Sequence, residues 1–112
     1  MSCRVNGKTN DISLTRGDTC TVKIDIIDQD GILYEPVEGD TVRFAMKQNY
    51  DKGAPAIIKE IPIDTMILKL DPEDTKRLCY GKYVYDVELT KANGDVDTFI
   101  TKATLTLTEE VY

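Results

Sequence analysis

Histidine and tryptophan are both absent from this chain of 112 residues, and cysteine occurs only three times. Without an imidazole, the Ser/His/Asp and Cys/His nucleophile arrangements are excluded, together with imidazole proton shuttles and metal ligands. Cys3, Cys20 and Cys79 lie far apart and form no Cys-x-x-Cys pair, so a four-ligand zinc site would need added carboxylates. We therefore expect no cofactor and three free thiols in a reducing compartment.

Basic residues and long apolar runs are also scarce. The 14 basic residues are outnumbered by 20 acidic ones, and the formal net charge of -6 repels nucleic acid. No apolar run approaches the roughly 18 residues of a membrane span, and the N-terminal residues lack the apolar core of a signal peptide. We expect neither nucleic acid nor a membrane as a partner, and we expect synthesis in the cytoplasm.

Alanine is rare, with 5 residues, whereas valine, isoleucine and threonine together supply 32. Stiff β-branched side chains favour strands over helices. The 41% of apolar residues is enough to bury a core, and the chain length suits one domain, which we place at residues 1–112. The composition therefore predicts a single all-β domain.

Period-two alternation of apolar and polar residues places the strands. Turn signals such as Asn93-Gly94 separate them, and a single helix-like segment begins with Asp71 as N-cap and Pro72 at the first position. The predicted strands are residues 21–27, 32–34, 41–47, 56–61, 66–70, 82–90, 96–101 and 103–108. This pattern predicts an immunoglobulin-like β-sandwich of eight or nine short strands with one short helical turn.

Two tyrosines stand at the start of the clearest strand, in the pattern Gly81-x-Tyr83-x-Tyr85. The pattern is typical of the tyrosine corner of immunoglobulin-type sandwiches. We expect Tyr83 and Tyr85 to be structural, with a ring in the core and a hydroxyl on a backbone acceptor. The alternative use of tyrosines is a stacking surface for sugars or peptides.

Acidic residues gather at two places. Asp25, Asp28 and Asp30 would make a loose ion site or a solvated turn. Asp71, Glu73 and Asp74 are explained by helix capping and the helix dipole rather than by catalysis. We therefore expect no enzymatic activity, and a small hydrolase using paired carboxylates is the weakest alternative.

Several segments, in a fixed order, resemble the N-terminal domain of upper baseplate proteins from tailed phages of Gram-positive bacteria. The matching segments are DISLTRGDT at residues 11–19, DG at 30–31, GDTVRF at 39–44, LDPEDTKRL at 70–78, GKYVYDV at 81–87 and NGDVDT at 93–98. The resemblance spans residues 11–110. It implies an immunoglobulin-like sandwich and a non-enzymatic structural role in a phage or prophage tail or baseplate, with other tail or baseplate proteins as partners and the virion as its location.

A protein of this kind works through contacts at a sheet edge or a sheet face. Proline protects the segments around Pro55 and Pro62 against strand addition, whereas the last strand carries an uncharged threonine face. We therefore predict an interface on the sheet of the last strand, formed by Thr104, Thr106 and Thr108 and used by a partner protein or a second copy. A module that binds glycans or a host surface is the alternative function.

Overall fold

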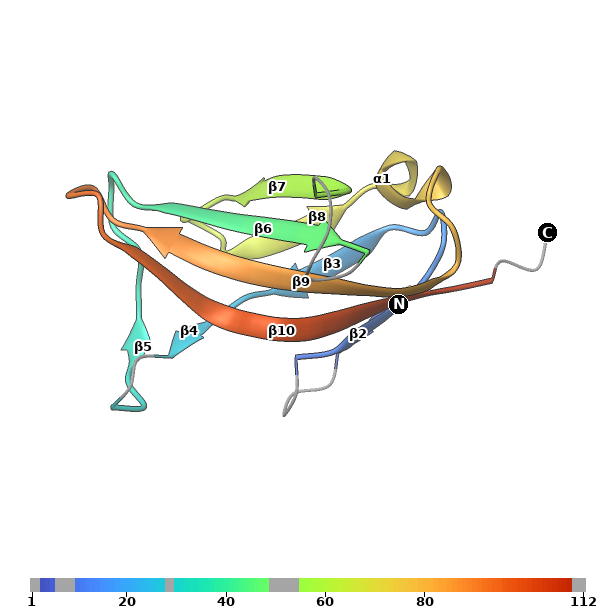
Figure 1. Cartoon of the computed structure of the whole chain (residues 1–112). Helices are drawn as coiled ribbons and strands as arrows, with labels where there is room; N and C mark the ends of the chain where they lie inside the picture. Colours follow the sequence, from blue (N-terminus) through green and yellow to red (C-terminus); the bar gives the residue numbers. More distant parts are fainter. Residues whose placement is uncertain (1–2, 6–9, 28–29, 49–54, 110–112) are drawn as a thin grey trace.

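The structure is a computed structural model that describes residues 3–5, 10–27, 30–48 and 55–109; at residues 3–5 and 101–102 it describes the backbone alone. This part of the chain forms ten strands and one helix (Figure 1). The elements are β1 (Cys3–Val5), β2 (Ile12–Thr15), β3 (Cys20–Lys23), β4 (Ile26–Ile27), β5 (Leu33–Tyr34), β6 (Thr41–Lys47), β7 (Ile57–Ile61), β8 (Ile67–Leu70), α1 (Pro72–Lys76), β9 (Gly81–Thr90) and β10 (Val96–Thr108).

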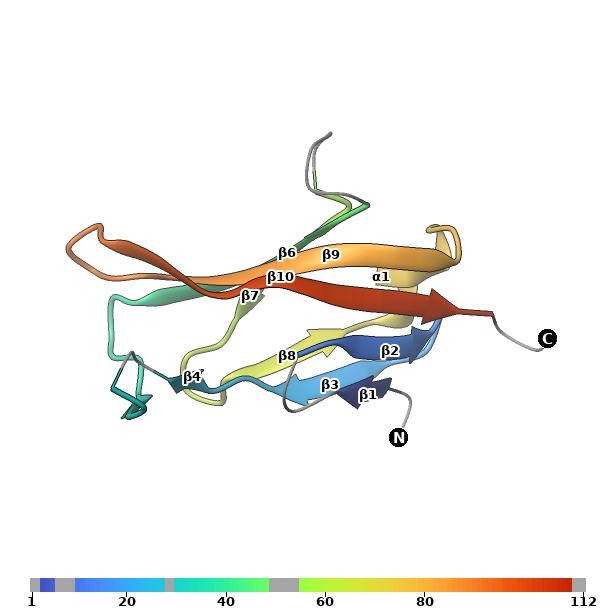
Figure 2. The ribbon, with the colours of Figure 1, turned by 60° about the horizontal axis from the view of Figure 1, so that its bottom comes forward.

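Two layers face each other across the core. Six strands form one sheet in the order β1-β2-β10-β9-β6-β7, in which β2 runs parallel to β10 and the other neighbours are antiparallel. The sheet curls after β10, so that β1 and β2 lie with β3 and β8 in the opposite layer (Figure 2). The all-β, immunoglobulin-like sandwich expected from the sequence is confirmed.

Alternation along the strands decides which side chains fill the core. In β6, Val42, Phe44 and Met46 are fully buried, as the pattern predicts. The Phe44 ring packs against the Tyr85 ring of β9 at 5.2 Å between centroids, in a tilted arrangement. Burial of these alternating side chains supplies the hydrophobic driving force that holds the layers together.

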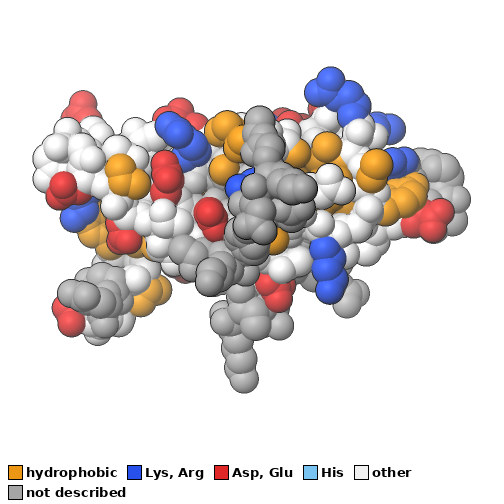
Figure 3. All heavy atoms as spheres, viewed as in Figure 1, with side chains coloured by type: hydrophobic (Ala, Val, Ile, Leu, Met, Phe, Trp, Pro, Cys, Tyr) orange, Lys and Arg blue, Asp and Glu red, His pale blue; other side chains and the backbone are white. Residues whose placement is uncertain are grey.

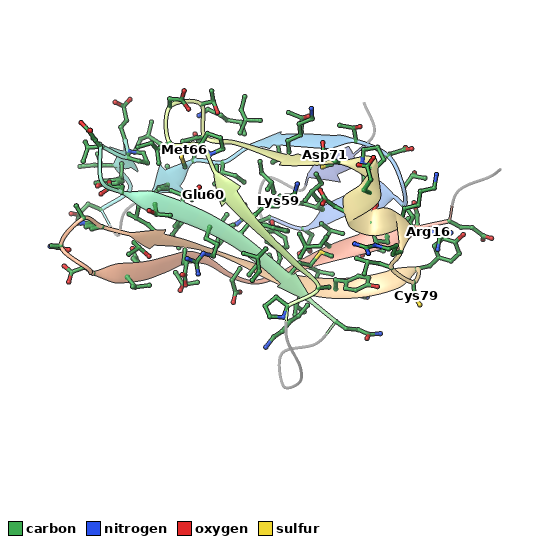
Figure 4. The ribbon with its side chains drawn as sticks, turned by 90° about the horizontal axis from the view of Figure 1, so that it is seen from above. Arg16, Lys59, Glu60, Met66, Asp71 and Cys79 are labelled. Atoms are coloured by element: carbon green, nitrogen blue, oxygen red, sulfur yellow. The ribbon has the colours of Figure 1, made fainter. Side chains whose placement is uncertain are left out.

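The helical turn forms where its capping residues predict it. Asp74 accepts a hydrogen bond from the Asp71 backbone N–H at 2.7 Å, and Pro72 begins the five-residue helix α1. Lys59 of β7 lies under the helix, with its Nζ 2.8 Å from Asp74 Oδ2 and 3.4 Å from Asp71 Oδ2 (Figure 4). These acidic residues therefore cap a helix and bind a lysine.

Four sequence predictions need correction. The strand predicted at residues 21–27 is divided into β3 and β4, which belong to different sheets. Residues 96–101 and 103–108 are a single strand, β10, whose pairing with β9 shifts register twice. The strands β1 and β2 were not predicted, and the described residues form ten strands instead of the eight or nine expected. Cys20 is disulfide-bonded, so the expectation of free thiols is wrong for this residue, whereas Cys79 is free and exposed. Cys20 begins β3, which β1 contacts, and the sequence alone does not reveal which strands become neighbours.

Candidate protein-interaction surface

The predicted interface strand lies inside its sheet rather than at an edge. Residues 105–108 of β10 pair with β2 on one side, and residues 103–107 pair with β9 on the other. Thr106, for example, stands opposite both Ser13 and Lys82. An interface formed by adding a partner strand to β10 is ruled out at these residues, because β2 occupies the backbone groups that an incoming strand would need. An interface on the face of this sheet stays a prediction.

The three threonines differ in exposure and in contacts. Thr104 and Thr106 are half-buried and Thr108 is exposed. The Thr104 backbone N–H donates to the Asp11 carboxylate at 3.0 Å, and the Thr108 hydroxyl donates to the Leu14 carbonyl at 3.4 Å. These bonds fasten β10 to the segment around β2, so this end of the strand contributes to the fold.

Tyr83 and Tyr85 both place their rings in the core. The Tyr83 hydroxyl donates to the carbonyl of Cys79 at 2.9 Å, which is the geometry of a tyrosine corner. The Tyr85 hydroxyl donates to the carbonyl of Asn10. Burial, with a smaller contribution from the negative charge of Asp11, raises the pKa of Tyr85 to about 12. Neither ring is available to stack on a ligand.

Exposed apolar side chains gather on a different part of the molecule. Of the large hydrophobic residues exposed in the described part of the chain, four lie within residues 27–37: Ile27, Ile32, Leu33 and Val37. The strands β4 and β5 form a separate two-stranded unit, which we call the arm, and it projects from one end of the sandwich (Figure 1). Ile27 and Leu33 stand opposite each other in the arm and are 54% and 50% exposed.

The inner face of the arm is anchored to the sandwich. Ile26 is buried, and its neighbour Tyr34 packs against the core. The Tyr34 hydroxyl donates to Asp40 Oδ2 at 2.6 Å, and the same oxygen accepts the Val37 N–H at 3.0 Å. Lys91, from the turn between β9 and β10, lies over the Tyr34 ring at 5.3 Å from its centroid. The contacts of Tyr34 therefore hold the arm to the sandwich, while Ile27 and Leu33 face solvent.

A hollow of about 380 Å³ lies beside the arm. Its walls are residues 23–26, residues 33–36 and the turn at residues 63–66. Leu33 lines the hollow and also belongs to the exposed pair of the arm, so the two features form one continuous surface. Figure 3 shows acidic side chains over this end of the molecule and hydrophobic ones beside the arm.

Other candidate sites have structural roles in this fold. Asp25 pairs with Lys23 at 3.0 Å, and Asp28 lies outside the described residues. At the opposite end, the Arg16 guanidinium stacks on Tyr80 at 4.4 Å and donates to the Leu78 carbonyl (Figure 4). Within the described residues, no group of three or more acidic or cysteine side chains is placed to hold a metal ion. No helix in that part has the length and apolar character to cross a membrane.

The sequence predicted strands that end at residue 27 and cover residues 32–34, but not that Ile27 and Leu33 stay exposed on a unit apart from the sandwich, although a signal for this exists. The doublets Ile26-Ile27 and Ile32-Leu33 interrupt the alternation of apolar and polar residues. Because successive side chains of a strand point to opposite faces, a doublet on a strand with one buried face must expose one apolar residue. The structure shows this outcome at Ile26 and Ile27, which are 3% and 54% exposed.

No protein-family model, curated protein or solved structure matches this chain. The resemblance to phage upper baseplate proteins therefore stays a prediction from the residues that carry it.

Proposed function

We propose that this chain is a non-enzymatic structural protein of a phage or prophage, a component of the tail or baseplate that acts through protein–protein contacts. The observation that carries the contact role is the outward apolar pair Ile27 and Leu33 on the projecting arm. Exposed apolar side chains that cluster on a soluble domain mark interaction sites, because water contact with them is unfavourable until a partner covers them.

Two further features support the proposal. The segments that resemble upper baseplate proteins span residues 11–110, which include all of the arm. The structure places these segments in an immunoglobulin-like sandwich, the fold that the resemblance implies. The partners are then other tail or baseplate proteins, and a homo-oligomer is the alternative assembly.

The glycan-binding alternative needs exposed aromatic rings. Tyr83 and Tyr85 are buried, Tyr34 packs against the core, and Tyr80 is 44% exposed with Arg16 stacked on its ring. The described tyrosines thus offer a poor platform for sugar stacking, which favours the assembly role.

Particle composition tests the proposal. Phage or prophage particles purified from the bacterium that carries the gene should contain this chain, detected by mass spectrometry. Deletion of the gene should give particles with incomplete tails and lower infectivity, and a plasmid copy should restore both. Particles that lack the chain and assemble normally without the gene would overturn the proposal, and binding of the isolated chain to host cell-wall glycan would favour the recognition module.

A further inference from the structure

The hollow beside the arm is lined by both apolar and polar residues, and carboxylates stand at its rim. We propose that it binds a segment of a different protein in which an apolar side chain is flanked by lysine or arginine. This inference rests on the proposed function, because it names the partner chemistry of the same surface.

Apolar side chains form part of the walls of the hollow, alongside polar ones. Ile24 and Ile26 are buried on one side, Ile63 and Met66 close the opposite side, and Leu33 continues the apolar surface onto the arm. The volume of about 380 Å³ suits one or two side chains of a partner segment rather than a whole element. An apolar side chain seated there would cover Leu33, which is 50% exposed in the isolated chain.

The charges at the rim favour a cationic partner. Lys23 lines the hollow, but its ammonium is already paired with Asp25 at 3.0 Å. Glu35 and Asp64 also line it, and neither carboxylate has an ion pair or a hydrogen-bonding side chain among the described residues. Two carboxylates without an ion pair attract a segment that brings positive charge. This attraction steers the encounter and selects against acidic segments.

The wall formed by residues 63–66 is preformed. Met66 adopts a left-handed backbone with φ of 53°, a strained conformation for a residue with a side chain. Its N–H donates to the Pro62 carbonyl at 2.7 Å, and its carbonyl accepts the Ile24 N–H at 2.8 Å. Figure 4 shows Met66 at this end of the sandwich. Two backbone bonds thus hold the strained residue, so a partner need not order this wall on binding.

A second copy of the chain is a poor occupant. A second copy would bring a net charge of -6 to a surface that already carries Glu35 and Asp64. Like charges across an interface oppose association. The acidic rim therefore argues for a heterologous partner.

Two short peptides probe the surface directly. The cationic probe is acetyl-Gly-Lys-Leu-Arg-Gly-amide, and the matched acidic probe is acetyl-Gly-Glu-Leu-Glu-Gly-amide. We expect the cationic peptide to give saturable shifts of the Ile24, Leu33, Glu35 and Met66 amides in ¹⁵N-resolved NMR spectra, with weaker binding at high salt. Equal binding of both peptides, shifts elsewhere on the molecule, or no saturable shift would overturn the proposal.

Two double variants separate the effect of charge at the hollow from the effect of the net charge of the protein. Glu35→Gln/Asp64→Asn should weaken binding of the cationic peptide about fivefold. Glu73→Gln/Asp97→Asn removes the same charge from exposed sites elsewhere and should leave binding unchanged. Equal weakening by both double variants would contradict a site in the hollow. A concentration-dependent dimer of the wild type that Leu33→Ser abolishes would assign the surface to a second copy and overturn the proposal.

Incorporation into particles distinguishes failure of the proposed function from failure of the proposed docking site. If wild-type chain is absent from purified particles, the proposed function fails, whatever the peptides do. If wild-type chain is incorporated and Glu35→Gln/Asp64→Asn is incorporated equally well, the docking site is wrong while the structural role survives. Loss of incorporation in this variant, but not in Glu73→Gln/Asp97→Asn, supports both.

Discussion

Gly39 faces Ala92 so closely that a Cβ on residue 39 would lie 2.8 Å from the Ala92 Cβ. The contact joins the loop that follows the arm to the turn between β9 and β10. Gly39 also has a φ of +97°, a backbone conformation that residues with a side chain rarely adopt. Two independent constraints therefore require glycine at this position.

The first prediction concerns this contact. Gly39→Ala should destabilise the fold by about 3 kcal/mol, because backbone strain of about 1–2 kcal/mol adds to the cost of overpacking. Gly31→Ala is the matched control, since Gly31 has a φ of +82° and open space around it, and it should cost only about 1–2 kcal/mol. Urea unfolding measures both. If adding Ala92→Gly to Gly39→Ala restores no stability, the steric account is wrong.

The second prediction concerns pH and the base of the arm. The hydrogen bond from Tyr34 and the Val37 N–H lower the pKa of Asp40 below its usual 3.8, and the same hydrogen bond raises the pKa of Tyr34 above 10.0. A lowered Asp40 pKa gives stability that is present above pH 3.8 and lost as pH falls through the folded value. A raised Tyr34 pKa gives stability that is present below pH 10.0 and lost as pH rises through the folded value.

The variant Tyr34→Phe removes the contribution of Tyr34 and the part of the Asp40 contribution that the Tyr34 hydroxyl supplies, while the hydrogen bond from the Val37 N–H remains. The difference in unfolding free energy between wild type and Tyr34→Phe should be greatest near neutral pH and shrink on both the acid and the alkaline side. Urea unfolding over a pH series measures this difference. A difference that stays constant across the series would show that the hydrogen bond does not couple the two groups.

The third prediction tests the tyrosine corner. Tyr83→Phe keeps the buried ring but removes the bond to the Cys79 carbonyl, and it should cost about 1 kcal/mol. Tyr83→Ala should cost about 3 kcal/mol or more, because it also leaves a cavity. Tyr80→Phe, at an exposed ring, should change stability by less than about 0.5 kcal/mol and serves as the control. Equal effects of Tyr83→Phe and Tyr80→Phe would contradict the corner.

The fourth prediction concerns the cap of α1. Asp74→Ala removes the acceptor of the Asp71 N–H and the nearest carboxylate of Lys59, and it should cost about 1–2 kcal/mol. Glu73→Ala, at an exposed position of the same helix, should cost less than about 0.5 kcal/mol. Thermal unfolding followed by circular dichroism compares the two, and similar melting temperatures would contradict the capping role.

Much of the fold was predictable because its signals are local. Alternation in β6 and β9 gave the buried faces correctly, since successive side chains of a strand point to opposite sides whatever the strand pairs with. The turn at Asn93-Gly94 also formed as predicted: Gly94 has a φ of +95°, and its N–H donates to the Lys91 carbonyl at 2.8 Å. Steric preferences of a few neighbouring residues decide such features.

The candidate site was not predictable in the same way. The edge prediction for Thr104 to Thr108 failed because β2, nearly the whole chain away in sequence, pairs with this end of β10. The strands of the arm were predicted in part, but the exposure of Ile27 and Leu33 was missed, because it depends on which face of β4 and β5 the core covers.

The sequence by itself determined an all-β chain, the inward faces of its long strands, its turns and its capped helix, because these follow from side-chain branching, alternation and backbone sterics. Only the tertiary structure decided which strand occupies each edge, that Cys20 is disulfide-bonded, and that apolar side chains of the arm remain outside. These outcomes depend on pairing between segments far apart in the chain. Such pairing is set by competition among all possible strand neighbours for the same backbone hydrogen bonds and the same core.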